Sequence, residues 1–175
     1  MPIFLLAQPS MVHNFAITEW FAIFPDIQIV MKPMDMVVPG GGSRIGSDRG
    51  KVPQLGILPK YAWADAEMRW FEVPGFNQMH TLNAWQEGEE TIILVAPNIL
   101  LIGHTLERME LVHSNVKMVC IELQSGAILR MPHFIKNLDF GVIHVGYIGR
   151  NRFTYLRVGD HMPKIFGVRM LDFSL

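Results

Sequence analysis

Short runs in which apolar and polar residues alternate recur along the whole chain and predict β-strands. In residues 11–17 this pattern places His13 on one strand face with Phe15 and Ile17, because successive side chains of a strand point to opposite sides. A histidine at such a position is expected to point in the same direction as the large apolar side chains. The first run therefore predicts an inward-facing imidazole.

A second histidine follows the same pattern in residues 76–85. Alternation puts His80 on one face with Gln78, Leu82 and Ala84, while the intervening residues fall on the other face. Since the two histidine runs are separate in the sequence, they predict two different strands. Two inward-facing imidazoles on two strands can meet at one centre, and this pair is the main candidate for chemistry in the chain.

The remaining alternation predicts an all-β protein. Residues 21–31 are interpreted as two short strands, or as one strand with a bulge at Pro25 and Asp26. Further strands are predicted at residues 34–38, 52–59, 68–73, 91–96, 116–123, 127–131, 138–145, 153–158 and 165–173. Many short strands with glycine or proline between them favour a barrel, a sandwich or a propeller. No sequence repeat is visible, so a propeller would have divergent blades.

Two segments interrupt this series of strands. Residues 39–51 are rich in glycine and are predicted to form a long loop. This loop lacks the residue spacing of a phosphate-binding loop, and no helical pattern follows it, so we interpret it as a turn. Residues 97–109 fit the face of a short helix about as well as a loop that leads into a strand, and both interpretations stay open.

The composition is compatible with one domain. A chain of 175 residues can bury about 70% of its extended surface in a single globular domain. Hydrophobic residues make up 50% of the chain and charged residues only 18%, so little polar surface is available. This balance suits either a protein with a large apolar cavity or a piece of a larger domain, and composition does not separate the two.

Charge and cysteine content exclude several functional classes. The net charge of −1, without a basic cluster, argues against nucleic-acid binding. Cys120 is the only cysteine, so no disulfide can form within the chain, and its alternating run predicts a small core residue. No stretch is long and apolar enough for a transmembrane helix, and the first residues lack the pattern of a secretion or transit signal.

The histidine pair suggests a metal site. Neutral imidazole is a common ligand of iron, zinc and copper, and a site with open positions for oxygen suits non-haem Fe(II). No local metal-binding motif joins His13 to His80, so a hydrogen-bonded core histidine is the alternative for each. Asp139 and Glu19 lie next to predicted strands, and a carboxylate there could bind the second N–H of a ligand imidazole and orient it.

Other candidate residues have weaker patterns. His144 lies in a strand-like run and is the one further histidine with such a setting. The histidines expected at the surface, near loops or strand ends, are His104, His113, His133 and His161. Three aromatic residues could line an apolar pocket, with core packing as the alternative: Trp70, Phe71 and Tyr155.

A resemblance to a known family lies in the runs MVHNFAITEWF, FPDIQIVMKPMDMV, KVPQLGILPKYA, MRWFEVPGFNQMHTLNAW and NLDFGVI. They are similar to the carotenoid cleavage dioxygenases of plants, in particular to the plastid carotenoid cleavage dioxygenase 4 type, which VAPNIL, HTLERMELVH and GDHMPKIFGV also resemble. The similarity extends from Gln8 to Asp172. It implies that residues 1–175 are a partial domain, an incomplete arc of a seven-bladed β-propeller.

The resemblance also implies an activity and its residues. The family holds Fe(II) with four histidines beneath a lipophilic tunnel and cleaves a conjugated double bond of a carotenoid with O2. The histidine of its HDFAIT motif falls on His13 and that of its H-x-x-NAWE motif on His80, both as iron ligands. The carboxylate of its NL(D/E)xG stretch falls on Asp139, which would orient a ligand histidine. The other two iron histidines are expected upstream and downstream of residues 1–175.

Further expectations follow from this family. The resemblance implies cleavage at the 9,10 (9′,10′) double bond, a plastid location, and peripheral contact with the plastid membrane or with plastoglobule lipid. An incomplete propeller also leaves strand edges and sheet faces uncovered, which predicts partial folding or self-association.

The chain departs from the family at several positions. Asn14 stands where the family has aspartate, Trp20 where it has asparagine, and Gln86 where it has glutamate. His144 and Val145 replace an asparagine-proline pair. These changes predict altered hydrogen bonding and packing near the histidines. They also keep an alternative open, that the chain is a truncated, non-catalytic paralogue acting as a carotenoid-binding or interaction fragment.

Overall fold

The computed structural model describes residues 6, 8–34, 37, 45–100, 102, 108–143, 146, 153–159 and 164–173, with only the backbone for 109 and 130–136. These residues form an all-β structure, which confirms the predicted fold class. The strands are β1 (Ala16–Ile17), β2 (Phe21–Asp26), β3 (Ile29–Met31), β4 (Ile45–Ser47), β5 (Gln54–Pro59), β6 (Arg69–Glu72), β7 (Asn83–Glu87), β8 (Thr91–Leu100), β9 (His113–Glu122), β10 (Ile128–Lys136), β11 (Leu138–Val142), β12 (Phe153–Val158) and β13 (Gly167–Asp172). Short 3-10 helices occur at η2 (Asp65–Glu67) and η4 (Met109–Leu111). In the described ranges, no helix is both long and apolar enough to cross a membrane.

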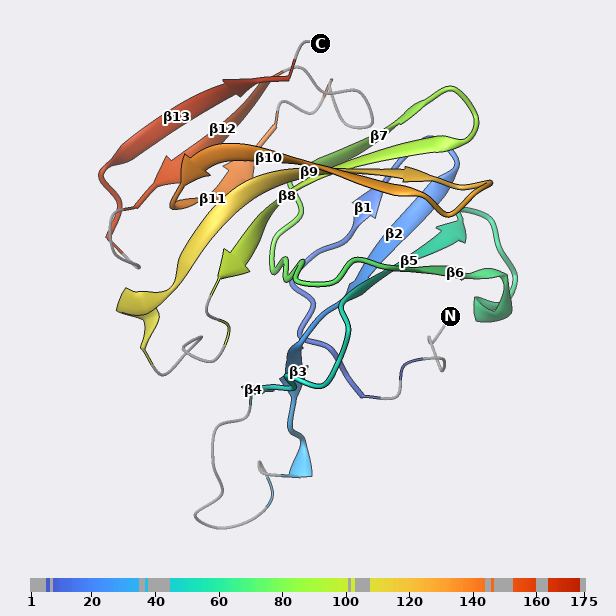
Figure 1. Ribbon diagram of the computed structural model, residues 1–175, viewed down its shortest axis with the longest axis horizontal. Coiled ribbons are helices and arrows are strands. Elements are labelled where there is room, and N and C mark those ends of the chain that lie inside the picture. Colours follow the sequence, from blue (N-terminus) through green and yellow to red (C-terminus); the bar gives the residue numbers. More distant parts are fainter. Residues whose placement is uncertain are drawn as a thin grey trace.

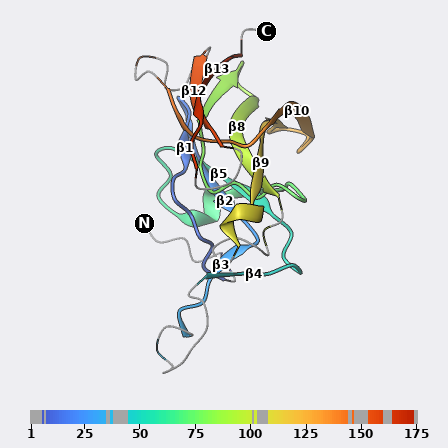
Figure 2. The same cartoon turned by 90° about the vertical axis from the view of Figure 1, so that its left-hand side faces the viewer.

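Three larger sheets are stacked, and a small one lies below them and packs against the end of β8 through Ile29 and Ile99 (Figure 1). The first sheet has the strand order β1-β2-β5-β6, the second β10-β9-β8-β7 and the third β11-β12-β13. All strand pairs within these sheets are antiparallel. β3 and β4 form a separate pair, which lies below the larger sheets in both views (Figure 2). The second and third sheets are built from consecutive strands, whereas the β3–β4 pair is inserted between β2 and β5 of the first sheet.

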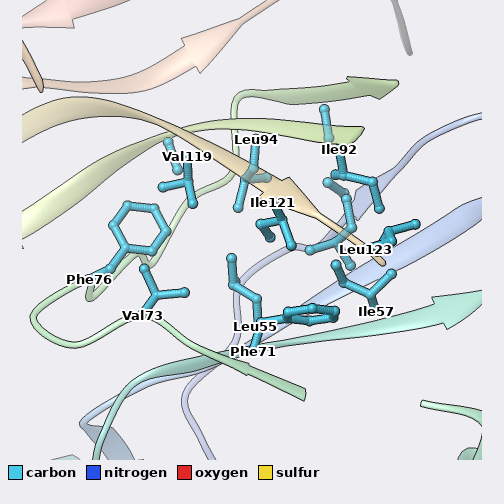
Figure 3. Packing of buried hydrophobic residues seen from close by; sticks show 14 residues of the cluster. Leu55, Ile57, Phe71, Val73, Phe76, Ile92, Leu94, Val119, Ile121 and Leu123 are labelled. Atoms are coloured by element: carbon cyan, nitrogen blue, oxygen red, sulfur yellow. The ribbon is translucent and has the colours of Figure 1, made fainter. Parts of the chain in front are cut away.

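An apolar core joins the first sheet to the second (Figure 3). Leu55 and Phe71 come from the first sheet, Leu94 and Ile121 come from the second, and all four are buried. Fully burying one such side chain stabilises the fold by about 1.5–3 kcal/mol. This contact therefore fixes the position of the first sheet on the second.

The second sheet is covered on both faces. Its other face contributes Trp85, Val95 and Met118 to a second apolar cluster, in which Leu138 and Leu156 come from the third sheet. A strand that is covered on both faces carries apolar residues at successive positions rather than at alternate ones. This explains the continuous apolar run of β8 and confirms the buried strand predicted at residues 91–96.

β8 is longer than the sequence pattern predicted. It continues to Leu100 because its residues pair with β9 along its whole length, up to the pair of Leu100 and His113. The interpretation of residues 97–109 as a short helix is therefore wrong for residues 97–100. The last residue of that segment, Met109, begins η4.

The predicted loop at residues 39–51 contains a short strand. Residues 45–47 form β4, which pairs with β3 in register, so the loop prediction is wrong for these three residues. Residues 39–44 lie outside the described residues. Residues 21–31 form two strands, β2 and β3, as in the first of the two interpretations. Of the strand predicted at residues 34–38, only 34 and 37 are described, and neither is in a strand.

A buried carboxylate anchors the segment that leads to His13. Asp26, at the end of β2, is 3% exposed and forms an ion pair with Lys51. The same carboxylate accepts hydrogen bonds from Ser10 Oγ and from Gln54 Nε2, the latter at 3.0 Å. Because a buried charge is costly without such partners, this network holds the chain in place shortly before the histidine.

Cys120 is half-buried and packs against the second apolar cluster. Burial raises the pKa of its thiol, and the negative charge of Glu87 raises this pKa further. The thiol is therefore protonated at neutral pH and is a poor nucleophile. This agrees with the packing role expected from the sequence, although the residue is less deeply buried than predicted.

Candidate metal centre

The structure brings His13 and His80 together. Their ring centroids are 5.0 Å apart and their planes are inclined by 70°, which is an edge-to-face arrangement. His13 belongs to the segment before β1, and His80 lies in the bend before β7. Because β1 and β7 contact each other, the first and second sheets converge at the histidine pair.

Neither histidine lies in a strand, so this part of the sequence prediction is wrong. In the first run only Ala16–Ile17 forms a strand, and in the second run β7 begins at Asn83. The side chain of His80 is 19% exposed, whereas His13 is exposed. Each imidazole is thus presented by an irregular segment that leads into a strand, and the proximity of the pair does not come from a shared strand face.

Asp139 binds the imidazole of His80. Its Oδ1 atom is 3.0 Å from Nδ1 of His80, and the carboxylate side chain is only 12% exposed. Because a carboxylate accepts hydrogen bonds, Nδ1 of His80 carries the hydrogen and Nε2 keeps a free lone pair. The same Oδ1 atom accepts the backbone N–H of Phe140 at 2.7 Å. The ring of His80 is therefore held in one orientation.

Phe140 covers the imidazole of His80 and was not singled out from the sequence. The two ring centroids are 4.6 Å apart, and the guanidinium of Arg157 lies 4.6 Å from the centroid of the Phe140 ring. Phe140 has a φ of 49°, and the pairing of β11 with β12 shifts between Asp139 and Val142. Such a bulge redirects side chains. It points both Asp139 and Phe140 toward His80.

Two side-chain amides join the first histidine segment to the second. Thr81 N–H donates to Oδ1 of Asn14 at 2.7 Å, and Nδ2 of Asn14 donates to the carbonyl of Thr81 at 3.0 Å. Further along both segments, Trp20 N–H donates to Oε1 of Gln86 at 3.1 Å. At two positions where the chain differs from the family, Asn14 and Gln86, the side chain thus forms hydrogen bonds between the two segments. At the third such position, Trp20 is 57% exposed.

The remaining sequence candidates lie elsewhere. Glu19 and Tyr155 are exposed, Trp70 is half-buried, and Phe71 belongs to the core between the first two sheets. His104, His144 and His161 lie outside the described residues, as does the side chain of His133. Of the two carboxylates suggested by the sequence, only Asp139 contacts a histidine of the pair.

His113 is not the surface residue that the sequence suggested. It is half-buried at the start of β9, and its Nδ1 atom is 2.9 Å from Oδ1 of Asn137. Asn137 has a φ of 58° and precedes β11. His113 therefore helps to fix the turn between β10 and β11.

The histidine pair has the chemistry of two metal ligands. In the neutral imidazole of His80 the lone pair is on Nε2, since Nδ1 carries the hydrogen toward Asp139, and neutral imidazole nitrogen suits Fe(II). Among the described residues, no group of three His, Cys, Asp or Glu side chains could hold a metal ion. His13 and His80 therefore fit two positions around an Fe(II) ion and do not complete its ligand set.

A family model described as RPE65, retinal pigment epithelial membrane protein, matches residues 1–174. The chain is 61% identical to the Oryza sativa subsp. japonica protein named 9-cis-epoxycarotenoid dioxygenase NCED1, chloroplastic, over 99% of this chain and 27% of that one. It is 55% identical to the Crocus sativus zeaxanthin 7,8(7′,8′)-cleavage dioxygenase, chromoplastic, over 100% of this chain and 47% of that one. It is 51% identical to the Arabidopsis thaliana probable carotenoid cleavage dioxygenase 4, chloroplastic, over 99% of this chain and 30% of that one.

These relatives confirm the resemblance to plant carotenoid cleavage dioxygenases that the sequence showed. The chain spans between 27% and 47% of their length. Among solved structures, a cobalt-substituted Synechocystis ACO superposes with a TM-score of 0.71 at 17% identity, over 94% of this chain and 38% of that one. An ACO/RPE65 chimera superposes with a TM-score of 0.73 at 18% identity, over 95% and 39%. This likeness identifies the stacked sheets as an incomplete arc of a β-propeller.

Proposed function

Because the chain belongs to the RPE65 family of carotenoid oxygenases, we propose that it is part of a non-haem Fe(II) dioxygenase that cleaves a carotenoid with O2. The observation that carries this proposal is the contact of His13 with His80, together with the hydrogen bond between His80 and Asp139. In this proposal residues 1–175 are a partial propeller domain. The rest of the iron ligand set comes from outside these residues.

The described residues have distinct roles in this proposal. His13 and His80 would hold the iron, His80 through Nε2, and the iron when bound would supply the activation of O2 next to the substrate. Asp139 keeps the hydrogen on Nδ1 of His80, so that Nε2 stays available as a ligand atom. Phe140 covers one side of the His80 imidazole and excludes water there. The protein groups thus orient and shield the ligands and need no acid–base role.

The substrate class and the bond are part of the same proposal. A carotenoid is the substrate, and the 9,10 (9′,10′) double bond is the one that the sequence resemblance implies. Relatives that are similar over the whole chain carry names for other reactions, 9-cis-epoxycarotenoid cleavage and 7,8(7′,8′) cleavage. Since closely similar chains are named for different bonds, product analysis decides the position. The plastid location is supported by relatives named chloroplastic and chromoplastic.

A chimera tests the activity of these residues in a complete protein. Residues 1–175 replace the matching segment of the Crocus sativus relative, which is expressed in bacteria that accumulate zeaxanthin. We expect loss of colour and the appearance of apocarotenoid carbonyl products. The same chimera with His80→Ala should stay coloured. A soluble chimera that leaves the carotenoid intact would overturn the proposed activity, while products cut at 7,8 would overturn only the 9,10 assignment.

A second candidate function is a non-catalytic carotenoid-binding or interaction fragment. The observation that favours it is the set of departures from the family at Asn14, Trp20 and Gln86, close to the two histidines. In this case the chimera leaves the carotenoid intact, and the purified chain retains carotenoid absorbance after expression in the same bacteria. Absence of pigment on the purified chain would count against this candidate.

The outer face of the third sheet predicts self-association. Tyr155, Val168 and Met170 lie there with exposures of 44%, 70% and 51%. Uncovered apolar sheet faces and free strand edges promote association. We expect the 175-residue chain to elute as an oligomer in size-exclusion chromatography with light scattering, and the double variant Val168→Lys, Met170→Glu to shift toward the monomer mass. A wild-type chain that stays a compact monomer would contradict this prediction.

Exposed aromatic side chains predict contact with a lipid surface. Trp20, Tyr61 and Trp63 are 57%, 79% and 96% exposed, and Lys60 precedes Tyr61. Tryptophan and tyrosine favour the boundary between lipid and water. We propose that these residues contact the plastid membrane or plastoglobule lipid. In flotation with plastid-lipid vesicles, Trp63→Ser should lower the bound fraction, whereas Val52→Ser should leave it unchanged. Equal binding of the wild type and Trp63→Ser would exclude this contact.

A further inference from the structure

The side-chain amide of Asn14 binds the backbone next to the second histidine. It accepts from Thr81 N–H at 2.7 Å and donates to the Thr81 carbonyl at 3.0 Å. The residue that follows His13 is thus joined by two hydrogen bonds to the residue that follows His80. An amide can do this because it presents an acceptor and a donor side by side, whereas a carboxylate only accepts.

The segment around His13 has little other backbone support. Within the described part of the chain, residues 12–15 form no hydrogen bond between backbone groups. The nearest such contacts are Met11 N–H, which donates to the Ile29 carbonyl at 2.9 Å, and the start of β1 at Ala16. The side chain of Asn14 therefore supplies the hydrogen bonds that strand pairing would otherwise give.

Thr81, in contrast, belongs to a fixed part of the second sheet. Its hydroxyl accepts a hydrogen bond from Nε2 of Gln78 at 3.2 Å, and both residues are buried. The next residue, Leu82, donates its backbone N–H to the carbonyl of Val95 in β8 at 2.9 Å. Asn14 thus ties the less supported histidine segment to a well-supported one.

We propose that Asn14 is the positioning residue of the histidine pair. Its amide fixes the segment of His13 on the backbone of Thr81 and thereby sets the contact between the two imidazoles. The consequence for iron binding rests on the proposed function, whereas the geometry of the two rings does not.

Nuclear Overhauser spectroscopy on the metal-free 175-residue chain tests the proposal. The ring of His80 should show cross-peaks to His13 and to Phe140, whose centroids lie 5.0 and 4.6 Å away. In Asn14→Leu, which keeps the size of the side chain but removes both hydrogen bonds, and in Asn14→Ala we expect loss of the cross-peak between His13 and His80. The cross-peak between His80 and Phe140 should remain, because Asp139 holds the His80 ring independently of Asn14.

Gln86→Ala is the matched control. It removes the other side-chain hydrogen bond between the same two segments, the one from Trp20 N–H, and should keep both cross-peaks. The positioning role is overturned if the contact of His13 with His80 persists in both Asn14 variants. It is equally overturned if the Asn14 variants lose both cross-peaks, or if Gln86→Ala has the same effect as they do.

Anaerobic Fe(II) titration of the same variants separates this proposal from the proposed function. We expect Fe(II) binding about 10-fold weaker in Asn14→Leu than in the wild type, and unchanged in Gln86→Ala. If the wild type binds no iron while the Asn14 variants still lose the ring contact, the positioning role stands and the proposed function fails. If the wild type binds iron and Asn14→Leu binds it equally well, Asn14 has no role toward the metal.

Discussion

Replacing Leu94 by alanine is expected to lower the free energy of unfolding by about 3 kcal/mol. Leu94 lies in β8 and is fully buried in the core between the first and second sheets. β8 is paired on both sides, with β7 and with β9, so its backbone cannot move to fill the cavity that the substitution leaves. Complete domains have unfolding free energies of about 5–15 kcal/mol, and an arc with uncovered faces lies low in that range. A loss of about 3 kcal/mol from about 5 kcal/mol leaves about 2 kcal/mol, so the variant stays mostly folded in water but unfolds at a much lower urea concentration.

Urea unfolding followed by circular dichroism measures this effect, and Leu129→Ala is its matched control. Leu129 lies on β10 of the same sheet but is 61% exposed, so the same deletion removes little buried surface. We expect its effect to stay within about 0.5 kcal/mol. Equal destabilisation by the two substitutions would show that the second sheet does not bury Leu94 between itself and the first sheet.

The position of β8 shows what the apolar pattern can predict. A continuous apolar run requires cover on both strand faces, and the second sheet is indeed packed against both of its neighbours. The end of β8 was not predictable in the same way. Pro97 and Asn98 weaken the local strand pattern, but the cross-strand pairs with Val116 and Asn115 override it. Pairing with the next strand, β9, thus determines where β8 ends.

The histidine segments show the limit of reasoning from alternation. Alternation near His13 and His80 is real, yet neither residue is in a strand, because no neighbouring strand pairs with them. The segment of His13 is held by the side chain of Asn14 instead. A side-chain hydrogen bond between residues far apart in sequence leaves no periodic signal. The pairing of these two segments could not be predicted from the pattern of either one.

The orientation of His80 was predictable only in part. Family resemblance pointed to Asp139 as the carboxylate partner, and the structure places it on Nδ1 of His80. Phe140 was missed because its contact depends on a bulge in β11, where a residue other than glycine adopts a positive φ. The adjacent Gly141 was the available hint. Its hydrogen points at Leu82, and a Cβ there would lie 2.2 Å from Cδ2 of Leu82.

Removing His80 is expected to weaken anaerobic Fe(II) binding by the 175-residue chain by at least about 10-fold. The affinity of such a site depends on the number of ligands and on their preset geometry, so a two-histidine site is weak from the start. His80→Ala leaves one imidazole of the pair. Asp139→Asn keeps both imidazoles but removes the charge that favours the Nδ1–H form of His80, and we expect a loss of about 10-fold.

His113→Ala is the matched control for this titration. His113 also has a side-chain partner on Nδ1, the Oδ1 atom of Asn137, but the structure shows no second histidine ring against it among the described residues. If any histidine of the chain can bind the iron, regardless of its position, His113→Ala weakens binding as much as His80→Ala does. If the pair binds it, His80→Ala, His13→Ala and Asp139→Asn weaken binding and His113→Ala does not. Equal affinity of His80→Ala and the wild type would show that the contact of His13 with His80 is a packing contact and not a pair of iron ligands.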